Sequence, residues 1–149
     1  MEAWLLYDKS RVDRNIHYIN IYFKECRKRN IKLKLILIED IEFGIKDNKC
    51  ALFYKKEECS LPQFVIMRTI NPLLSKQFEN MGVPVFNNSF VSYICNDKQK
   101  TYQYVSKANV KIMDTLFLKK GASVSIEYPS IVKPSFGSGG ENVFLVKNE

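Results

Sequence analysis

The sequence predicts an α/β fold built on a parallel β-sheet, followed by a smaller α+β segment. Apolar runs at residues 4–7 and 33–38 flank a helical repeat, and further strand and helix signals follow in alternation. After about residue 90 the pattern changes, and a helical stretch leads into strands joined by a glycine-rich loop. We therefore expect one domain over residues 1–90 and an incomplete second domain over residues 91–149.

The first unit of this pattern is a strand, a helix and a strand. Between the runs 4–7 and 33–38, apolar residues repeat at steps of three and four: Ile16, Ile19, Phe23 and Cys26. Asp13 is a candidate N-cap for this helix, and Asn30 can take the left-handed conformation that ends it. A strand–helix–strand unit of this length favours parallel pairing of its two strands.

The next region, residues 41–59, predicts a β-hairpin with Asp47 and Asn48 in its turn, or else a loop with two short edge strands. Residues 61–67 then predict a third buried strand, which ends at Arg68. A fourth strand is expected near residues 83–86, after a second helix.

That second helix has a clear beginning and end. Asn71 can cap it, Pro72 suits its first turn, and Gly82 can end it. A further helical stretch is expected from residue 89 to about residue 108, with a break near Asn96–Asp97. The last two expected strands, residues 128–133 and 143–146, flank a glycine-rich turn.

Composition excludes several classes of protein. The chain has 149 residues, of which 46% are hydrophobic and 26% charged, as in ordinary globular proteins. No apolar run approaches the ~18 residues of a membrane-spanning helix, so we expect no membrane partner. The chain begins without a basic segment followed by an apolar one, so we expect no secretory signal and a cytoplasmic location.

Cysteine and histidine usage limits the possible chemistry. The four cysteines stand far apart without a CxxC pair, and His17 is the only histidine. This nearly excludes a zinc site and, unless His17 serves, a Cys-His or Ser-His catalytic pair. We expect free thiols, with disulfides as a minor alternative.

The net charge is +7, from 23 Lys and Arg against 16 Asp and Glu. Basic residues gather in two groups, Lys24, Arg27, Lys28, Arg29, Lys32 and Lys34, and then Lys98, Lys100, Lys119 and Lys120. They could attract a nucleotide or polyanion, or they could form a solvated face. The first group alternates with apolar residues, which favours a solvated face, and we expect no nucleic-acid partner.

A lysine followed by a glycine-rich loop is the sharpest local signal. Lys133 ends an apolar run, and the loop 135–142 contains three glycines and two serines. Backbone N–H groups of such a loop can point at phosphate oxygens while the lysine adds positive charge. The order of residues fits neither a P-loop nor a dinucleotide-binding fingerprint. The loop alone is equally compatible with a plain hairpin turn.

Several motifs in order resemble the ATP-grasp ligases, especially those of RimK type. The matching segments are residues 64–68, 77–87, Asp97-Lys98, 109–115, 131–134 and the glycine loop. The resemblance implies a Rossmann-like pre-ATP-grasp domain over residues 1–90, followed by the first part of an ATP-grasp small lobe. Two departures are Asn142, where the family has glycine, and Met113-Asp114, which replace the family's proline step. Asn tolerates the left-handed conformation, so the turn is expected to survive.

The resemblance also implies a site. Lys98 and Lys133 would bind the ATP phosphates, and a flexible loop would close over them, formed by Gly137, Ser138, Gly139 and Gly140. Arg68, at the carboxyl end of a strand, would contact the acid substrate, although an ion pair that fixes the following helix is an equal alternative. No side-chain nucleophile is required.

The implied reaction is carboxylate–amine ligation. A carboxylate attacks the γ-phosphate of Mg-ATP to give an acyl phosphate, and an amine then displaces phosphate. In the family a second lobe supplies the adenine contacts and the Mg²⁺ ligands, and Glu141 and Glu149 are not plausible substitutes. We therefore expect the chain to represent the N-terminal half of a ligase and not to catalyse ligation by itself.

The alternative from another class is a non-catalytic Rossmann-like module for binding or dimerisation. An unpaired strand edge can pair with a second copy of the chain, so both interpretations allow a homodimer. The ligase interpretation expects an exposed glycine loop with Lys98 and Lys133 together. The alternative expects that loop to be buried in an interface. A nucleic-acid-binding protein, with one continuous basic face, ranks third.

Overall fold

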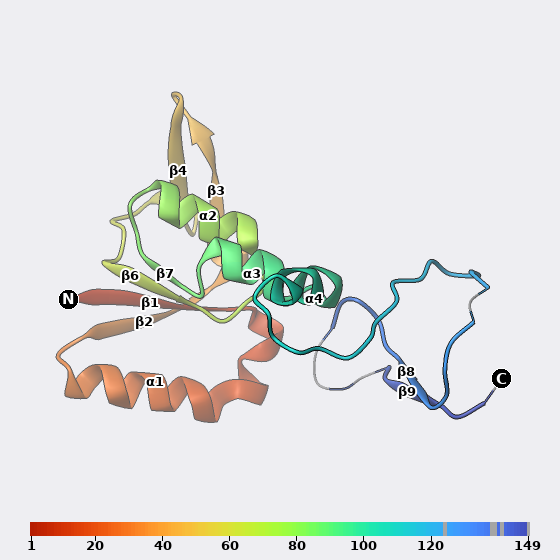
Figure 1. The fold of residues 1–149 in the computed structure, drawn as a ribbon. Coiled ribbons are helices and arrows are strands. Elements are labelled where there is room, and N and C mark those ends of the chain that lie inside the picture. Colours follow the sequence, from red (N-terminus) through yellow and green to blue (C-terminus); the bar gives the residue numbers. More distant parts are fainter. Residues whose placement is uncertain (124, 138–139, 141, 149) are drawn as a thin grey trace. The chain divides into compact units, whose positions relative to one another are not determined.

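Strand β1 (Glu2–Tyr7) is buried from Ala3 to Tyr7, as expected of a strand that is covered on both faces. In this computed structural model it pairs in parallel with β2 (Lys32–Leu37) on one side and with β6 (Phe64–Met67) on the other. Strand β7 (Val85–Phe86) pairs in parallel with β6, which gives the order β2-β1-β6-β7 (Figure 1). The predicted α/β fold with a parallel sheet is confirmed.

The structure describes residues 1–123, 125–137, 140 and 142–148. The chain divides into two compact units, Met1–Ser92 and Tyr93–Glu149. Each unit is considered by itself below.

Both faces of the parallel sheet carry a hydrophobic core. Helix α1 (Ile16–Lys28) covers one face, and helix α2 (Pro72–Asn80) lies over the other (Figure 1). The core on the α1 side consists of Ala3, Leu5, Tyr7, Ile19, Cys26 and Leu33. The core on the α2 side includes Trp4, Leu6, Val65, Met67, Leu74 and Phe78. Alternate residues of each strand therefore serve opposite cores, as the two-residue period of a strand requires.

The start of α1 differs from the prediction. Two 3₁₀ turns, η1 (Lys9–Arg11) and η2 (Asp13–Asn15), precede the helix, and Asn15 stands at its N-cap position without a side-chain cap. The prediction that Asp13 caps the helix is wrong, because Asp13 lies within the second of these turns. Its end follows the prediction, since Asn30 has φ +55°.

Helix α2 begins and ends as predicted. The Asn71 side chain accepts a hydrogen bond of 2.9 Å from the backbone N–H of Leu74, and Pro72 is the first helical residue. Gly82, with φ +80°, follows the helix. The cap and the proline together explain why the helix begins here.

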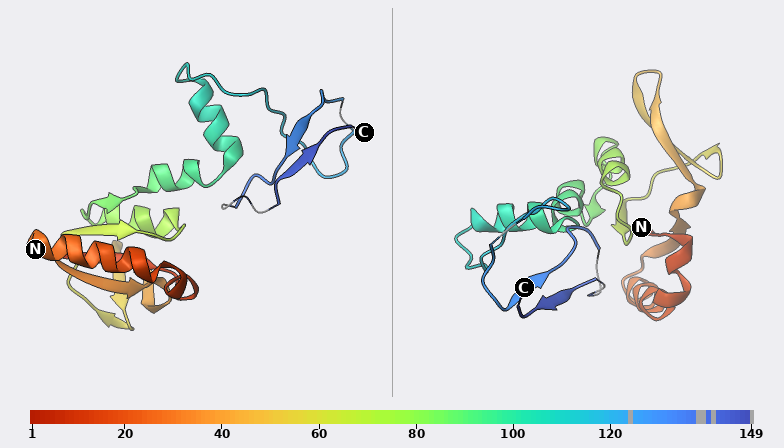
Figure 2. Two further views of the ribbon diagram at one scale, coloured as in Figure 1. Left: turned by 90° about the horizontal axis from the view of Figure 1, so that it is seen from below. Right: turned by 90° about the vertical axis from the view of Figure 1, so that its right-hand side faces the viewer.

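Between β2 and β6, a hairpin replaces the helix that usually connects consecutive strands of a parallel sheet. Strands β3 (Ile41–Lys46) and β4 (Lys49–Tyr54) pair antiparallel, and Asp47 and Asn48 have the positive φ values of a tight hairpin turn. A short strand, β5 (Glu57–Glu58), adds to β4. The hairpin extends away from the parallel sheet of its own unit (Figure 2). Of the two predicted alternatives, the hairpin is confirmed.

The Gln77 side chain connects this hairpin to α2. It donates hydrogen bonds to the backbone carbonyls of Gly44, at 2.7 Å, and Ala51, at 3.0 Å. Gln77 is 8% exposed, so its amide has exchanged water for these two carbonyls.

Helix α3 (Ser89–Cys95) spans the boundary of the two units, and helix α4 (Lys98–Ser106) follows it in the second unit. The break at Asn96–Asp97 is where the sequence predicts it. Strands β8 (Ser130–Val132) and β9 (Phe144–Val146) pair antiparallel in a two-stranded ribbon (Figure 2). Asn142, just before β9, has φ +57°, so it takes the left-handed conformation expected of it.

Within the described part of the chain, no helix combines the length and apolar character of a membrane span.

The cysteines are free, and burial raises the pKa of the Cys26 and Cys59 thiols. These two thiols are therefore less reactive than an exposed cysteine.

Candidate functional site

The N-terminus of α4 holds the lysine of the Asp97-Lys98 pair in place. Asp97 is 6% exposed, and its carboxylate accepts hydrogen bonds from the backbone N–H groups of Gln99, at 2.9 Å, and Lys100, at 3.4 Å. This is an ordinary N-cap, in which a carboxylate satisfies N–H groups that lack a helical partner. Lys98, the first residue of the helix, is thereby held in a defined position.

Lys98 contacts the glycine-rich segment twice. Its backbone N–H donates to the carbonyl of Ser135 at 2.9 Å, and its ammonium group donates to the carbonyl of Gly137 at 2.9 Å. A β-bridge between Asp97 and Phe136 joins the same two segments. The start of α4 and the beginning of the glycine loop are therefore neighbours within the second unit.

Lys133 contacts α4 from the other segment. Its ammonium group donates a hydrogen bond of 2.6 Å to the hydroxyl of Tyr102 and lies 4.9 Å from the centre of the tyrosine ring. Tyr102 follows Lys98 by four residues, so both side chains lie on one face of the helix. Through these contacts, the structure brings Lys98, Lys133 and Gly137 together around one face of α4.

Among the described residues, the ammonium groups of Lys98 and Lys133 form no ion pair with an acidic side chain. Their recorded acceptors are a carbonyl and a hydroxyl. Lys100 differs, since its ammonium lies 3.7 Å from the Asp97 carboxylate and 3.5 Å from the Tyr93 ring centre. Two cations that have no ion-pair partner in the described part of the chain, close to one backbone loop, favour an anionic ligand.

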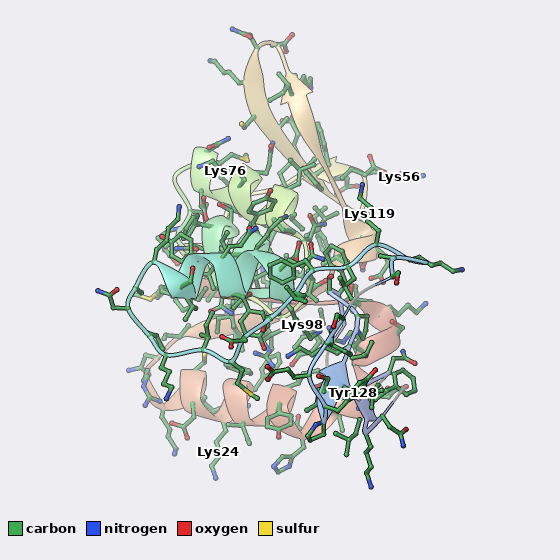
Figure 3. All side chains as sticks on the ribbon, turned by 45° about the vertical axis from the view of Figure 1, so that its right-hand side comes forward. Lys24, Lys56, Lys76, Lys98, Lys119 and Tyr128 are labelled. Carbon is green, nitrogen blue, oxygen red and sulfur yellow. The ribbon has the colours of Figure 1, made fainter. Side chains whose placement is uncertain are left out.

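The basic group around α1 behaves in the opposite way. Lys28 and Arg29 each pair with Glu25 at 2.7 Å, and hydrogen bonds first from Lys28 and then from Arg29 lower the pKa of Glu25 to about 2. Lysines of the first unit are also spread out, as Lys24, Lys56 and Lys76 show (Figure 3). Four members of this basic group thus have acidic partners, Lys28 and Arg29 with Glu25 and Lys32 and Lys34 with Glu2, which fits the solvated face that the sequence favours.

The glycine loop is described in part. Gly137 has φ +104° and Gly140 has φ +79°, and both are exposed. These are conformations that glycine adopts without steric cost. Ser138, Gly139 and Glu141 lie outside the described residues, so their expected places in the loop stay predictions.

Arg68 lies in the other unit, at the carboxyl edge of the parallel sheet. The chain passes from β1 to β2 on one side and later to β6 on the other, so the switch point of the sheet lies between β1 and β6. Arg68 follows β6 there and is exposed. The nearby Tyr7 hydroxyl raises the pKa of Arg68, outweighing the effect of burial. Within the described ranges, Arg68 has no acidic partner at ion-pair distance.

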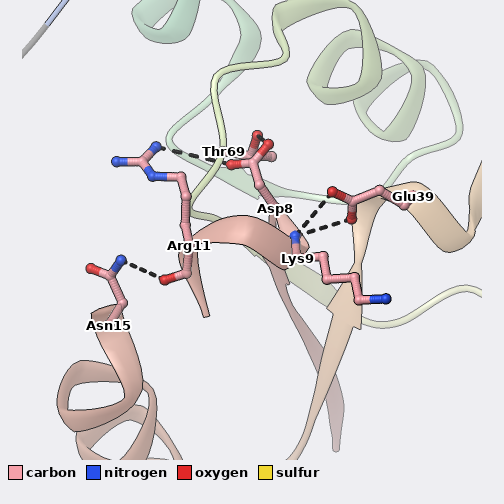
Figure 4. Close-up of polar contacts among 6 residues, drawn as sticks. All are labelled: Asp8, Lys9, Arg11, Asn15, Glu39 and Thr69. Atoms are coloured by element: carbon pink, nitrogen blue, oxygen red, sulfur yellow. Dashed lines mark hydrogen bonds and ion pairs between the residues drawn. The ribbon is translucent and has the colours of Figure 1, made fainter. Parts of the chain in front are cut away.

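Hydrogen bonds join the carboxyl ends of three strands at this edge (Figure 4). The Thr69 hydroxyl, after β6, donates to the Asp8 carboxylate, after β1, at 2.8 Å. The Glu39 carboxylate, after β2, accepts the backbone N–H of Lys9 at 3.0 and 3.1 Å. In nucleotide-binding α/β folds, a phosphate takes such an N–H after the first strand. Here a carboxylate occupies it, which makes this turn a poor phosphate site.

Comparison with known proteins gives a relationship in sequence and a relationship in fold. No protein-family model matches the chain. An uncharacterized protein of Mycoplasma pneumoniae, described as an MG011 homolog, is 25% identical over 148 residues, which are 99% of this chain and 47% of that protein. The crystal structure of a RimK domain protein of ATP-grasp type from Sphaerobacter thermophilus matches with a TM-score of 0.67 and 14% identity. The match covers 100% of this chain and 56% of that one.

The chain shares the fold of this RimK domain protein. This confirms the resemblance that the ordered motifs predict. The chain spans about half the length of both proteins, 47% of one and 56% of the other. The fold relationship is established along the whole of this chain, whereas the activity of a complete protein belongs to the proposal below.

The site in this chain contains one residue that the sequence motifs do not include. Tyr102, the acceptor for Lys133, stands four positions after the Asp97-Lys98 pair, and that helical spacing is the signal that could have found it. The described residues offer no set of Mg²⁺ ligands, because no three of their acidic, histidine or cysteine side chains lie close enough together to hold one metal ion. No magnesium ligand is assigned in this chain.

Proposed function

We propose that this chain is the N-terminal, phosphate-binding part of an ATP-dependent carboxylate–amine ligase. One observation carries the proposal: α4 brings Lys98, Lys133 and the exposed carbonyl segment at Gly137 together, with neutral oxygens as the acceptors of both ammonium groups. A triphosphate offers the negative charge that the described residues do not supply to these cations, and lysines with backbone groups are typical of sites that bind it.

In such a ligase, ATP phosphorylates a carboxylate to an acyl phosphate, which an amine then converts to an amide. The contribution of this chain is to neutralise and orient the triphosphate with Lys98, Lys133 and the glycine loop, including Gly137 and Gly140. Ser138 and Gly139 belong to the same proposed loop. Arg68 is the proposed contact for the acid substrate, because an exposed guanidinium at a sheet switch point suits a carboxylate.

The closed turn after β1 supports placing the triphosphate in the second unit. The Lys9 N–H is occupied by Glu39, so the parallel sheet does not offer the site that dinucleotide-binding folds use. The proposal also includes that this chain alone does not catalyse ligation. The chain spans about half the length of the two proteins it matches, and its described residues contain no candidate set of magnesium ligands.

Titration calorimetry with ATP and with inorganic tripolyphosphate tests the proposal on the unaltered chain and on Lys133→Met. We expect both probes to bind the unaltered chain and Lys133→Met to bind them at least tenfold more weakly, about 1.4 kcal/mol. Equal affinities would contradict the proposal. Sequencing the source gene past the codon for Glu149 is a complementary test, because a ligase predicts an open reading frame that encodes paired acidic and Asn metal ligands.

The alternative, an assembly module, has one observation in its favour. The β8–β9 ribbon exposes apolar side chains, among them Ile131, Val132, Phe144 and Leu145. Exposed apolar residues on a short ribbon favour association with a further chain or segment. Sedimentation velocity over a concentration series would support this second function if the chain dimerises and binds neither phosphate probe.

A further inference from the structure

Tyr102 occupies a particular place at the site. Its hydroxyl accepts the Lys133 ammonium at 2.6 Å, and its side chain lies one helical turn from Lys98. The Lys133 ammonium also lies 4.9 Å from the ring centre, within the range of a cation–π interaction. The same side chain therefore meets Lys133 with both its hydroxyl and its ring.

A tyrosine holds an ammonium group differently from a carboxylate. Because the phenol is neutral, it orients Lys133 without cancelling its charge, so the full charge remains for an anion. The hydrogen bond uses one of the three N–H donors of the ammonium and leaves two. Tyr102 uses its oxygen as the acceptor, and the described residues supply no recorded acceptor for its own proton.

We propose that Tyr102 positions Lys133 for a polyphosphate anion and donates its own hydroxyl proton to the same anion. This inference rests on the proposed function, and it adds a residue that the family motifs in the sequence do not contain. The anion-binding face of α4 then consists of Lys98 and Tyr102, one turn apart, and Lys133, which directly follows β8, is held against it.

A purely structural role for Tyr102 makes a different prediction. Its side chain is half-buried, so the ring contributes to packing. Tyr102→Phe keeps the ring and the cation–π contact and removes only the hydroxyl. A packing role would therefore leave anion affinity nearly unchanged in this variant, whereas the positioning role would not.

The test is calorimetric titration of the chain with inorganic tripolyphosphate and with adenosine. We expect Tyr102→Phe to weaken tripolyphosphate binding about tenfold, the value for one hydrogen bond to a charged group. Adenosine, which lacks phosphate, should show no difference between the two proteins. The matched control is Tyr93→Phe, because the Tyr93 ring contacts Lys100, which lies outside the site. This control should bind tripolyphosphate like the unaltered chain.

A double-mutant cycle separates the failure of this inference from that of the proposed function. If Tyr102 acts on Lys133, Tyr102→Phe should have much less effect in a Lys133→Met background than in the unaltered chain. Weak binding by Lys133→Met together with full binding by Tyr102→Phe would overturn the role of Tyr102 alone. Full binding by both variants, or no tripolyphosphate binding by the unaltered chain, would overturn the proposed function and this inference together.

Discussion

The ammonium group of Lys98 donates a hydrogen bond of 2.9 Å to the backbone carbonyl of Gly137, which connects the start of α4 to the glycine loop. The backbone N–H of the same lysine donates to Ser135. A side chain and a backbone group of one residue thus contact the same loop, so the cation and the loop are held as one local structure. A triphosphate that binds Lys98 must also meet this loop.

Replacing Lys98 should weaken phosphate binding. We expect Lys98→Met to reduce tripolyphosphate affinity about tenfold, because it removes a cation with no acidic partner among the described residues. The matched control is Lys107→Met at the other end of α4, which changes net charge equally. Calorimetric titration measures both. An equal loss in the two variants would mean that only the overall charge matters.

The conformation of Gly137 should matter more than its size. Its φ of +104° disfavours any other residue, although a Cβ would meet no atom within 4 Å. We expect Gly137→Ala to shift the loop carbonyl that Lys98 contacts and to lower tripolyphosphate affinity severalfold, since such strain costs about 1–3 kcal/mol. Gly121→Ala, with φ +77°, imposes similar strain elsewhere in the same unit and should bind normally.

Glu79 should stabilise the first unit in a pH-dependent way. Its carboxylate accepts the Ser89 backbone N–H at 2.6 Å and the Ser89 hydroxyl at 2.7 Å. Burial raises the pKa of Glu79, but the hydrogen bonds from Ser89 and the charge of Lys76 together lower it by more, so the pKa falls below its ordinary value of 4.5. This stabilisation is therefore complete above that value and is lost as the pH falls through the lowered pKa of the folded state.

Urea unfolding of Glu79→Gln checks this expectation. At neutral pH the variant should lose about 1–2 kcal/mol of unfolding free energy, because the amide accepts these hydrogen bonds more weakly than the carboxylate. The difference from the unaltered chain should shrink at acidic pH. Glu58→Gln is the control, since Glu58 forms an exposed pair with Lys46 and should matter little. A pH-independent difference would show that the charge of Glu79 is not the cause.

Thr69 should connect two strands at the switch point. Thr69 is 6% exposed, and its hydroxyl donates a hydrogen bond of 2.8 Å to the Asp8 carboxylate, between the carboxyl ends of β6 and β1. We expect Thr69→Val, which has nearly the same shape, to lower the unfolding free energy by about 1–2 kcal/mol. Thr115→Val, at an exposed position, is the control and should change stability by less than about 0.5 kcal/mol. Urea denaturation of both variants decides between these outcomes.

Local sequence determines the elements of this fold that depend on local chemistry. Asn71 and Pro72 start α2 because a cap and a fixed φ act within one turn, and Asp47-Asn48 forms the hairpin turn because both residues tolerate positive φ. The cap of α1 could not be predicted in the same way. There the chain leaves β1 through two 3₁₀ turns, and contacts of Asp8 and Lys9 with Thr69 and Glu39 hold that connection.

The sequence by itself determined the parallel α/β unit and the order of its strands and helices along the chain, because hydrophobic period and caps are written in neighbouring residues. It also proposed the lysines and glycines of the candidate site, whose role in binding stays a prediction. Only the tertiary structure placed Tyr102 against Lys133 and the carbonyl of Gly137 against Lys98. Those partners are separated by 31 and 39 positions, and only packing of α4 beside the glycine loop brings them within hydrogen-bond distance. A hydrogen bond is decided by fractions of an ångström, which no spacing in a sequence can specify.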